Sequence, residues 1–278
     1  MFDARRWRSC LALLVLVGCG DPAEEPAHAV DEVDELGPCE GLFGRPGPST
    51  GLDASRCSPV CTCEGGSWQA PDYDEAAIAA LESRVLLDPP AMLTADPYEQ
   101  PHEPPDEAGV CAIVPDADEP LAYRLRTYPD LPSVTADGAT VTHYGPCGLC
   151  SSLQDLAVYI RHDDLTTPVR TCGILGLSEG DDANLQCLLD LGFTPACAQI
   201  WFYNTAHTRS ACFSLCIGAL DDPFNREDGT LNPCLQCDED VSGPIFKSIA
   251  GRTRRNSGLP SAICRPCDGV ARVNHAYP

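Results

Sequence analysis

The chain has 278 residues, among them 18 cysteines, 18 basic and 41 acidic residues, and a formal net charge of −23 at pH 7. This length suffices for one or two domains with a buried core. The acidic balance excludes nucleic acid and anionic lipid head groups as expected partners, because like charges repel.

The first eighteen residues have the layout of an export signal. Three arginines precede an apolar run over residues 11–17, which is too short to span a bilayer because a spanning helix needs about 20 apolar residues. The segment Leu16-Val17-Gly18-Cys19 resembles the lipobox of bacterial lipoproteins. The resemblance implies cleavage before Cys19, acylation of Cys19 and attachment to a membrane, and Gly20 favours the outer membrane. A plain secretory signal with an incidental cysteine is the alternative.

The cysteine count supports export. Cys10 lies in the signal and Cys19 at the lipobox, so an even number of cysteines remains for the mature protein. Cysteines of exported proteins pair by default, because the compartment is oxidising. We therefore predict that most of them form disulfides.

Composition divides the mature chain into three parts. Residues 19–38 are acidic with little to bury, which predicts a solvated tether. Residues 39–71 hold four cysteines among glycines and prolines, and we expect a loop-rich knob held by disulfides. Residues 72–278 are expected to form a disulfide-rich, mainly helical domain.

The first elements of that domain are a helix and a small sheet. A helix is predicted over residues 75–87, capped by Asp72 or Asp74, with Ile78, Leu81 and Val85 on its buried face. Short apolar or alternating runs then predict an antiparallel β part over residues 110–143. Its strands are expected at 110–114, 121–128 and 139–143, with 115–120 as a hairpin loop.

A helical core is predicted over residues 147–217. Ser151 or Ser152 caps its first helix, and a second helix from Asp181 or Asp182 is joined by a short link to a third that begins at Thr194-Pro195. Such a link predicts a helical hairpin, with disulfides from Cys187 to the second arm and a break in that arm near Asn204. A later helix is capped by Ser242. The expected fold class is α+β, mostly helical and disulfide-rich, with a helical hairpin core and a small antiparallel β part.

Two cysteine motifs could carry chemistry. Cys147-Gly148-Leu149-Cys150 at a helix start is similar to the dithiol of thioredoxin-like enzymes, because a helix N-terminus favours the thiolate. The βαβ unit of that fold is missing, so we favour an inert bridge between Cys147 and Cys150. Cys234, Cys237, Cys264 and Cys267 could form a zinc site, but their spacing is unusual and an oxidising compartment competes for the thiols. No cofactor is expected.

Other motifs are less specific. Gly176-Leu177-Ser178-Glu179-Gly180 matches the nucleophile elbow of α/β-hydrolases, but the parallel sheet is missing and Glu179 opposes an oxyanion, so a helix-capping turn is expected. His162-Asp163-Asp164 could bind a metal or transfer protons, and the acidic loop over 221–228 could bind calcium loosely. We interpret both as solvated surface.

Arg252, Arg254 and Arg255 form the only dense basic island of the sequence. Guanidinium groups bind carboxylate or phosphate through paired hydrogen bonds, which makes the island a candidate anion site. We favour the alternative that these arginines pair with Asp238, Glu239 and Asp240 of the same chain.

The expected function is a binding or structural role at the cell envelope. The partners would be the membrane, through the lipid anchor, and an envelope protein or glycan. An extracytoplasmic thiol-disulfide oxidoreductase that uses Cys147 and Cys150 is the alternative, since no motif specifies another reaction.

Overall fold

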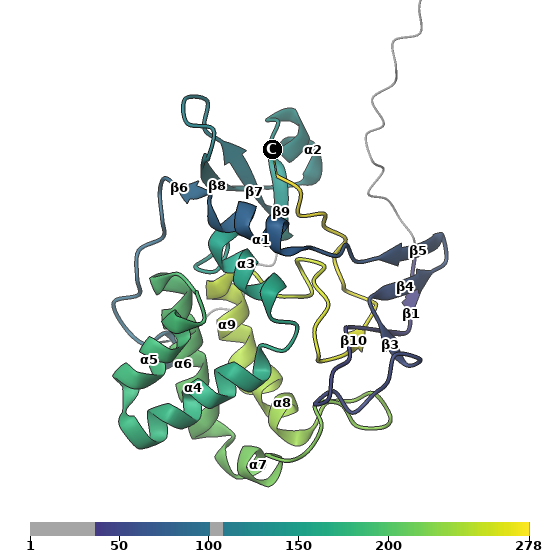
Figure 1. The fold of residues 1–278 in the computed structure, drawn as a ribbon, viewed down its shortest axis with the longest axis vertical. Coiled ribbons are helices and arrows are strands. Elements are labelled where there is room, and N and C mark those ends of the chain that lie inside the picture. The colour runs from purple at the N-terminus through teal and green to yellow at the C-terminus, as the bar shows by residue number, and fades with distance from the viewer. Residues whose placement is uncertain (1–36, 101–107, 278) are drawn as a thin grey trace, which may run out of the picture. The chain divides into compact units, whose positions relative to one another are not determined.

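The computed structural model describes residues 37–100 and 108–277, which belong to one compact unit extending from Glu35 to Pro278. The architecture is α+β, as predicted (Figure 1). It is also disulfide-rich, as predicted. The predicted signal, the lipobox with Cys19 and all but the end of the acidic tether lie outside the described residues.

A four-stranded sheet in the order β6-β8-β7-β9 is the main β element. Strands β7 (Val110–Pro115), β8 (Ala122–Tyr128) and β9 (Thr140–Tyr144) confirm the three predicted strands with nearly the same bounds. β7 is antiparallel to both of its neighbours, and the turn between β7 and β8 is the predicted hairpin loop. A short helix, α2 (Leu131–Ala136), has no counterpart among the predicted elements; Asp130 caps it.

The helix predicted over residues 75–87 is shorter than expected. Asp74 caps α1 (Glu75–Glu82), and Ile78 and Leu81 are buried as predicted. The next residues instead form β6 (Val85–Leu86), which pairs in parallel with β8, and Val85 is 54% exposed rather than buried. The free edge of β8 offers backbone hydrogen bonds to this segment, and β-branched valine favours a strand. Sheet pairing therefore replaces the last helical turn.

The cysteine-rich segment forms two small sheets, and one of them includes a strand from the C-terminal part of the chain. Their strands are β1 (Cys39–Glu40), β2 (Leu42–Phe43), β3 (Cys57–Ser58), β4 (Val60–Cys63), β5 (Gly66–Gln69) and β10 (Arg265–Pro266). One bridge, Cys39–Cys63, is internal, whereas Cys57–Cys264 and Cys61–Cys267 reach the C-terminal segment. The predicted knob is therefore cross-linked to the far end of the sequence.

Helix α3 (Leu153–Arg161) lies in the largest hydrophobic cluster, with Leu153 and Leu156 wholly buried. Ser152 caps it as predicted: its hydroxyl accepts a hydrogen bond from the Asp155 amide at 2.9 Å and donates one to the Asp155 carboxylate at 2.5 Å. Residues from α1, the central sheet and the later helices pack into the same cluster.

Three successive helices follow: α4 (Thr166–Glu179), α5 (Asp181–Asp190) and α6 (Pro195–Ala211). Thr194 caps α6 as predicted. Helix α4 has no counterpart among the predicted elements, because its glycines, proline and threonines have low helix propensity. Tertiary contact explains it: a Cβ on Gly176 would lie 2.9 Å from that of Asn184, so glycine lets α4 and α5 approach closely.

Two predictions about these helices are wrong. Cys187 is bonded to Cys172 of α4 rather than to the second arm of the predicted hairpin. Helix α6 continues past Asn204 and ends only at Ala211, where the short helix α7 (Phe213–Gly218) begins. Residues 176–180, which formally match a hydrolase elbow, form the last turn of α4, and Gly180 at φ 96° caps the helix, as the predicted helix-capping turn requires.

The C-terminal helices form a nearly continuous run. Helix α8 (Pro233–Cys237) passes through a π-helical turn, η2 (Asp238–Ser242), into α9 (Gly243–Ala250), where Phe246 is buried as predicted. Ser242 makes no side-chain cap; its hydroxyl lies 2.7 Å from that of Thr208 and 3.0 Å from a ring nitrogen of His207. A 3-10 turn, η1 (Pro97–Glu99), lies against α6. No helix in the described ranges is long and apolar enough to cross a membrane.

All sixteen cysteines of the described residues are paired, in eight disulfides. This confirms the prediction that most cysteines after Cys19 are bonded. Such a density of bridges indicates that the protein folds in an oxidising, extracytoplasmic compartment.

Candidate functional site

The first arginine of the basic island belongs to the buried core. Arg252 is 0% exposed and donates hydrogen bonds to the carbonyl oxygens of Thr142, Cys150 and Ser151, all at 3.0 Å. It also donates to the hydroxyls of Thr142 at 2.5 Å and Ser257 at 3.2 Å. A guanidinium has five N–H donors, so this one has none left for a ligand. Arg252 therefore neither belongs to an anion site nor pairs with Asp238, Glu239 or Asp240, so both predictions are wrong for this residue.

A buried serine–histidine pair lies beside Arg252. The Nδ1 atom of His143 donates to the Tyr144 carbonyl at 2.9 Å, so Nε2 accepts from the Ser151 hydroxyl at 2.7 Å. Burial, followed by the charge of Arg252, holds the pKa of His143 well below its usual range, which keeps the ring neutral. Both side chains are 0% exposed. Because no substrate can reach them, the pair is structural.

The second arginine fastens the C-terminal segment to the end of α3. Arg254 donates to the carbonyl oxygen of Pro260 at 2.8 Å and to that of His162, and its guanidinium lies 5.6 Å from the centre of the Tyr159 ring. Burial lowers its pKa to about 10. The segment His162-Asp163-Asp164, interpreted from the sequence as solvated surface, makes local contacts through its two acids: Asp163 pairs with Arg45, and Asp164 accepts a hydrogen bond from the Thr167 amide.

The third arginine lines a pocket. A cavity of about 320 Å³ lies among α4, α6, α7, α9, η2 and the segment after α9. Most of its wall is apolar: Leu165, Val169, Ile174, Leu177, Trp201, Phe213, Ile217, Leu220, Leu235, Phe246 and Ile263. The volume falls at the lower end of the range of small-ligand pockets, about 300 to 1,000 Å³.

Disulfides rather than burial hold the outer wall of this pocket. Helix α7 has no buried residue, and the bridges Cys212–Cys237 and Cys216–Cys234 fasten it to α8. Five pocket-lining side chains of α4, α7 and the following turn are 45–56% exposed: Ile174, Leu177, Phe213, Ile217 and Leu220. Exposed apolar groups that gather around a cavity are typical of ligand or partner sites.

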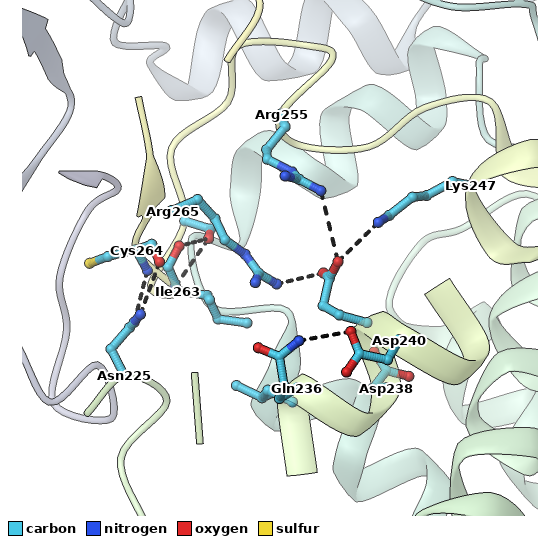
Figure 2. A network of polar contacts seen from close by, with 12 residues as sticks. Asn225, Gln236, Asp238, Asp240, Lys247, Arg255, Ile263, Cys264 and Arg265 are labelled. Atoms are coloured by element: carbon cyan, nitrogen blue, oxygen red, sulfur yellow. Dashed lines mark hydrogen bonds and ion pairs between the residues drawn. The ribbon is translucent and has the colours of Figure 1, made fainter. Parts of the chain in front are cut away.

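One end of the pocket is charged. The carboxylate of Glu239 lies 2.6 Å from Arg265, 2.9 Å from Lys247 and 3.8 Å from Arg255, and Figure 2 shows these three cations pointing toward a common centre. Burial alone would raise the pKa of Glu239, but the three cations outweigh it and lower that pKa. In all, six pocket-lining side chains are basic and three acidic. The pocket is thus a positive site in a strongly acidic protein.

The neighbours of Glu239 have other partners. Asp238 accepts hydrogen bonds from Thr208 at 2.5 Å and Asn204 at 3.2 Å, and its pKa is raised, chiefly by burial. Asp240 accepts from Gln236 at 2.8 Å (Figure 2). Of the acidic run over 238–240, only Glu239 therefore pairs with the basic island, and only through Arg255.

Two buried polar atoms line the same pocket without a hydrogen bond. The Tyr159 hydroxyl and the Trp201 indole nitrogen make no hydrogen bond of full geometry to a described residue, although the two side chains are neighbours and Trp201 partly offsets the rise that burial causes in the pKa of Tyr159. Buried polar groups are usually hydrogen-bonded, so these two can serve a ligand.

The cysteine motifs are not sites. Cys147 is bonded to Cys111 and Cys150 to Cys197, so neither the predicted inert bridge between them nor a redox dithiol is present. The bridges of α7 use Cys234 and Cys237, while Cys264 and Cys267 bond to the cysteine-rich segment, which excludes the alternative zinc site. Within 37–100 and 108–277, no cluster of three or more histidine, cysteine or acidic side chains could hold a metal.

Sequence reasoning missed most of the pocket. Lys247 and Arg265 lie apart from the basic island, and Phe213 to Leu220 do not form a buried helix face. One available signal was that Lys247 is the only lysine of the sequence. Another signal was the segment between Cys212 and Cys216, because its two apolar side chains, Phe213 and Leu215, are too few to form a buried helix face.

Comparison with known proteins gives one match. The model of a family of unknown function, DUF8771, matches residues 181–273. This range includes α5 to α9 and every charged residue around Glu239. No curated protein and no solved structure matches the chain.

Proposed function

We propose that this is a lipid-anchored protein of the cell envelope that binds a small apolar ligand in the pocket between α4 and α7. The acyl chains on Cys19 would attach it to the membrane, with the outer membrane favoured by Gly20. The acidic tether would hold the folded unit away from the bilayer. The eight disulfides support the extracytoplasmic part of this proposal.

The observation that carries the binding role is the exposed apolar rim of the pocket. Side chains such as Leu177 and Phe213 are more than half exposed although they surround a cavity of about 320 Å³. Covering them with a ligand removes apolar surface from water, which is worth about 25 cal/mol per Å². We assign the helical hairpin of α5 and α6, with α4 packed against both, the role of the scaffold.

A neutral dye tests the binding role. The chain from residue 20 onward includes the whole compact unit and can be exported behind a cleavable leader. Titration with Nile red should give saturable fluorescence with one site per protein. Gly173→Leu should weaken it at least ten-fold, because Gly173 lines the pocket and a Cβ there makes only ordinary contacts, at 3.6 Å or more. Thr171→Leu is the matched control, since Thr171 is an exposed residue of α4 outside the pocket. Equal dye binding by both variants would exclude this site.

Fatty-acid labelling tests the anchor. Cells given an alkyne fatty acid should label the wild type and not Cys19→Ala, and the mature N-terminus should be blocked. Equal labelling of the two proteins would refute lipidation at Cys19 while leaving the pocket proposal open to its own test.

A further inference from the structure

Three of the six basic side chains that line the pocket, Lys247, Arg255 and Arg265, share one carboxylate, that of Glu239. Each other ion-paired carboxylate in the described part of the chain serves a single arginine. Glu239 alone is shared by three cations. Because like charges held together repel, a second anion placed there would be stabilised.

Arg255 has donors available for that anion. Its nitrogen–oxygen distance to Glu239 is 3.8 Å, which is too long for a hydrogen bond, and its side chain is 41% exposed. None of its N–H groups donates a hydrogen bond to another described residue. The side chains of Lys247 and Arg265 are more enclosed, at 28% and 20% exposed, and both contact Glu239 directly.

The volume of the pocket limits the size of the ligand. The whole cavity, its charged and apolar parts together, measures about 320 Å³, at the lower end of the range for small ligands. A single alkyl chain of medium length with a small head group suits a site of this size. Glu239 already shows how a carboxylate lies among these cations, and a guanidinium fork suits a carboxylate.

We propose that the ligand is a single-chain amphiphile with a carboxylate head, a medium-chain fatty acid whose head lies at Arg255 and Lys247 and whose chain lies against α4 and α7. This inference rests on the proposed binding function and adds the chemical class of the ligand. The apolar chain accounts for the exposed rim, and the carboxylate for the excess of positive charge.

Tryptophan fluorescence can test the inference directly. After removal of the signal, Trp68 and Trp201 are the only tryptophans, and Trp201 lines the pocket, whereas Trp68 packs on Phe43 in another cluster. A Trp68→Phe background therefore reports on the pocket. At neutral pH and low salt, decanoate should bind at least ten-fold more tightly than 1-decanol, and decyl phosphate no more tightly than decanoate.

Variants locate the head group. Arg255→Gln should reduce the preference for decanoate over 1-decanol to about two-fold without changing the affinity for 1-decanol. Arg56→Gln is the matched control, because Arg56 is exposed and does not line the pocket. Since Lys247 is the only lysine, decanoate should also slow its acetylation by an amine-reactive ester, as followed by mass spectrometry, and 1-decanol should not.

The outcomes separate the two proposals. If neither decanoate, 1-decanol nor Nile red binds, the binding function itself is wrong. If 1-decanol binds as tightly as decanoate, the pocket binds apolar ligands but the carboxylate head is wrong. A preference for decanoate that survives Arg255→Gln, or ten-fold tighter binding of decyl phosphate, would also overturn the inference.

Discussion

Arg252 and Arg255 lie three residues apart in the chain and perform opposite tasks. Arg252 is 0% exposed and uses all its donors on oxygens of the surrounding backbone and hydroxyls. Arg255 is 41% exposed and has one distant ion pair. The comparison teaches that neighbouring arginines in a sequence need not form one site. The burial of each side chain separately determines whether its donors are used inside the fold or remain open to a ligand.

Substitution in the buried region around Arg252 should reduce stability more than substitution in the pocket region around Arg255. Arg252→Met removes five hydrogen bonds and leaves buried carbonyl oxygens without donors, so we expect a loss of about 3–5 kcal/mol in the free energy of unfolding. Urea unfolding with the disulfides intact measures this. A loss below about 1 kcal/mol would contradict the structural role given to Arg252.

Removal of one bridge of α7 should have the next largest effect, this time in the pocket region. The Cys216–Cys234 bridge closes a loop of 18 residues, and loops near this length contribute about 3 kcal/mol. We expect Cys216→Ala/Cys234→Ala to lose about that much stability in urea and also to lose dye binding, because α7 has no buried residue and only the Cys212–Cys237 bridge, at its first end, would still hold it. Retained dye binding would show that contacts other than the bridge position α7.

The carboxyl groups of the two regions, Asp155 near Arg252 and Glu239 in the pocket, should change the free energy of unfolding in opposite directions as the pH rises. Burial raises the pKa of Asp155, close to Arg252, to about 6 from 3.8, so its contribution to stability is present below pH 4 and is lost as the pH rises toward 6. The pKa of Glu239 is lowered from 4.5, so its contribution is present above pH 4.5 and is lost below it.

Unfolding measured from pH 3 to 7 checks this contrast. Between pH 4 and 6 the stability of wild type relative to Asp155→Asn should fall, by at most about 1.4 kcal/mol per pH unit. Over the acidic part of the range, the stability of wild type relative to Glu239→Gln should rise with pH. Slopes of the same sign would show that the two carboxyls do not differ as described.

Arg255→Met should have the smallest effect on stability. A half-exposed side chain with one ion pair of 3.8 Å contributes little, so we expect a change within about 0.5 kcal/mol. Urea unfolding of Arg255→Met and Arg252→Met under the same conditions measures this, and Arg255→Met is then the matched control for the first prediction. A loss of 2 kcal/mol or more would mean that Arg255 supports the fold rather than a ligand.

Local signals determined much of this protein. The Ser152 and Thr194 caps, the three strands between residues 110 and 144 and the pairing of the cysteines follow from short-range chemistry: a hydroxyl before a helix, alternating apolar residues, and an oxidising compartment. Only the tertiary structure decided which cysteines bond, that the weak helix former over 166–179 is a helix, and that Val85 joins a sheet. It also brought Glu239, Lys247, Arg255 and Arg265 together at one end of an apolar cavity. These outcomes depend on which segments pack against one another. That packing determines the burial of each side chain and the charges around it, and the local sequence does not specify it.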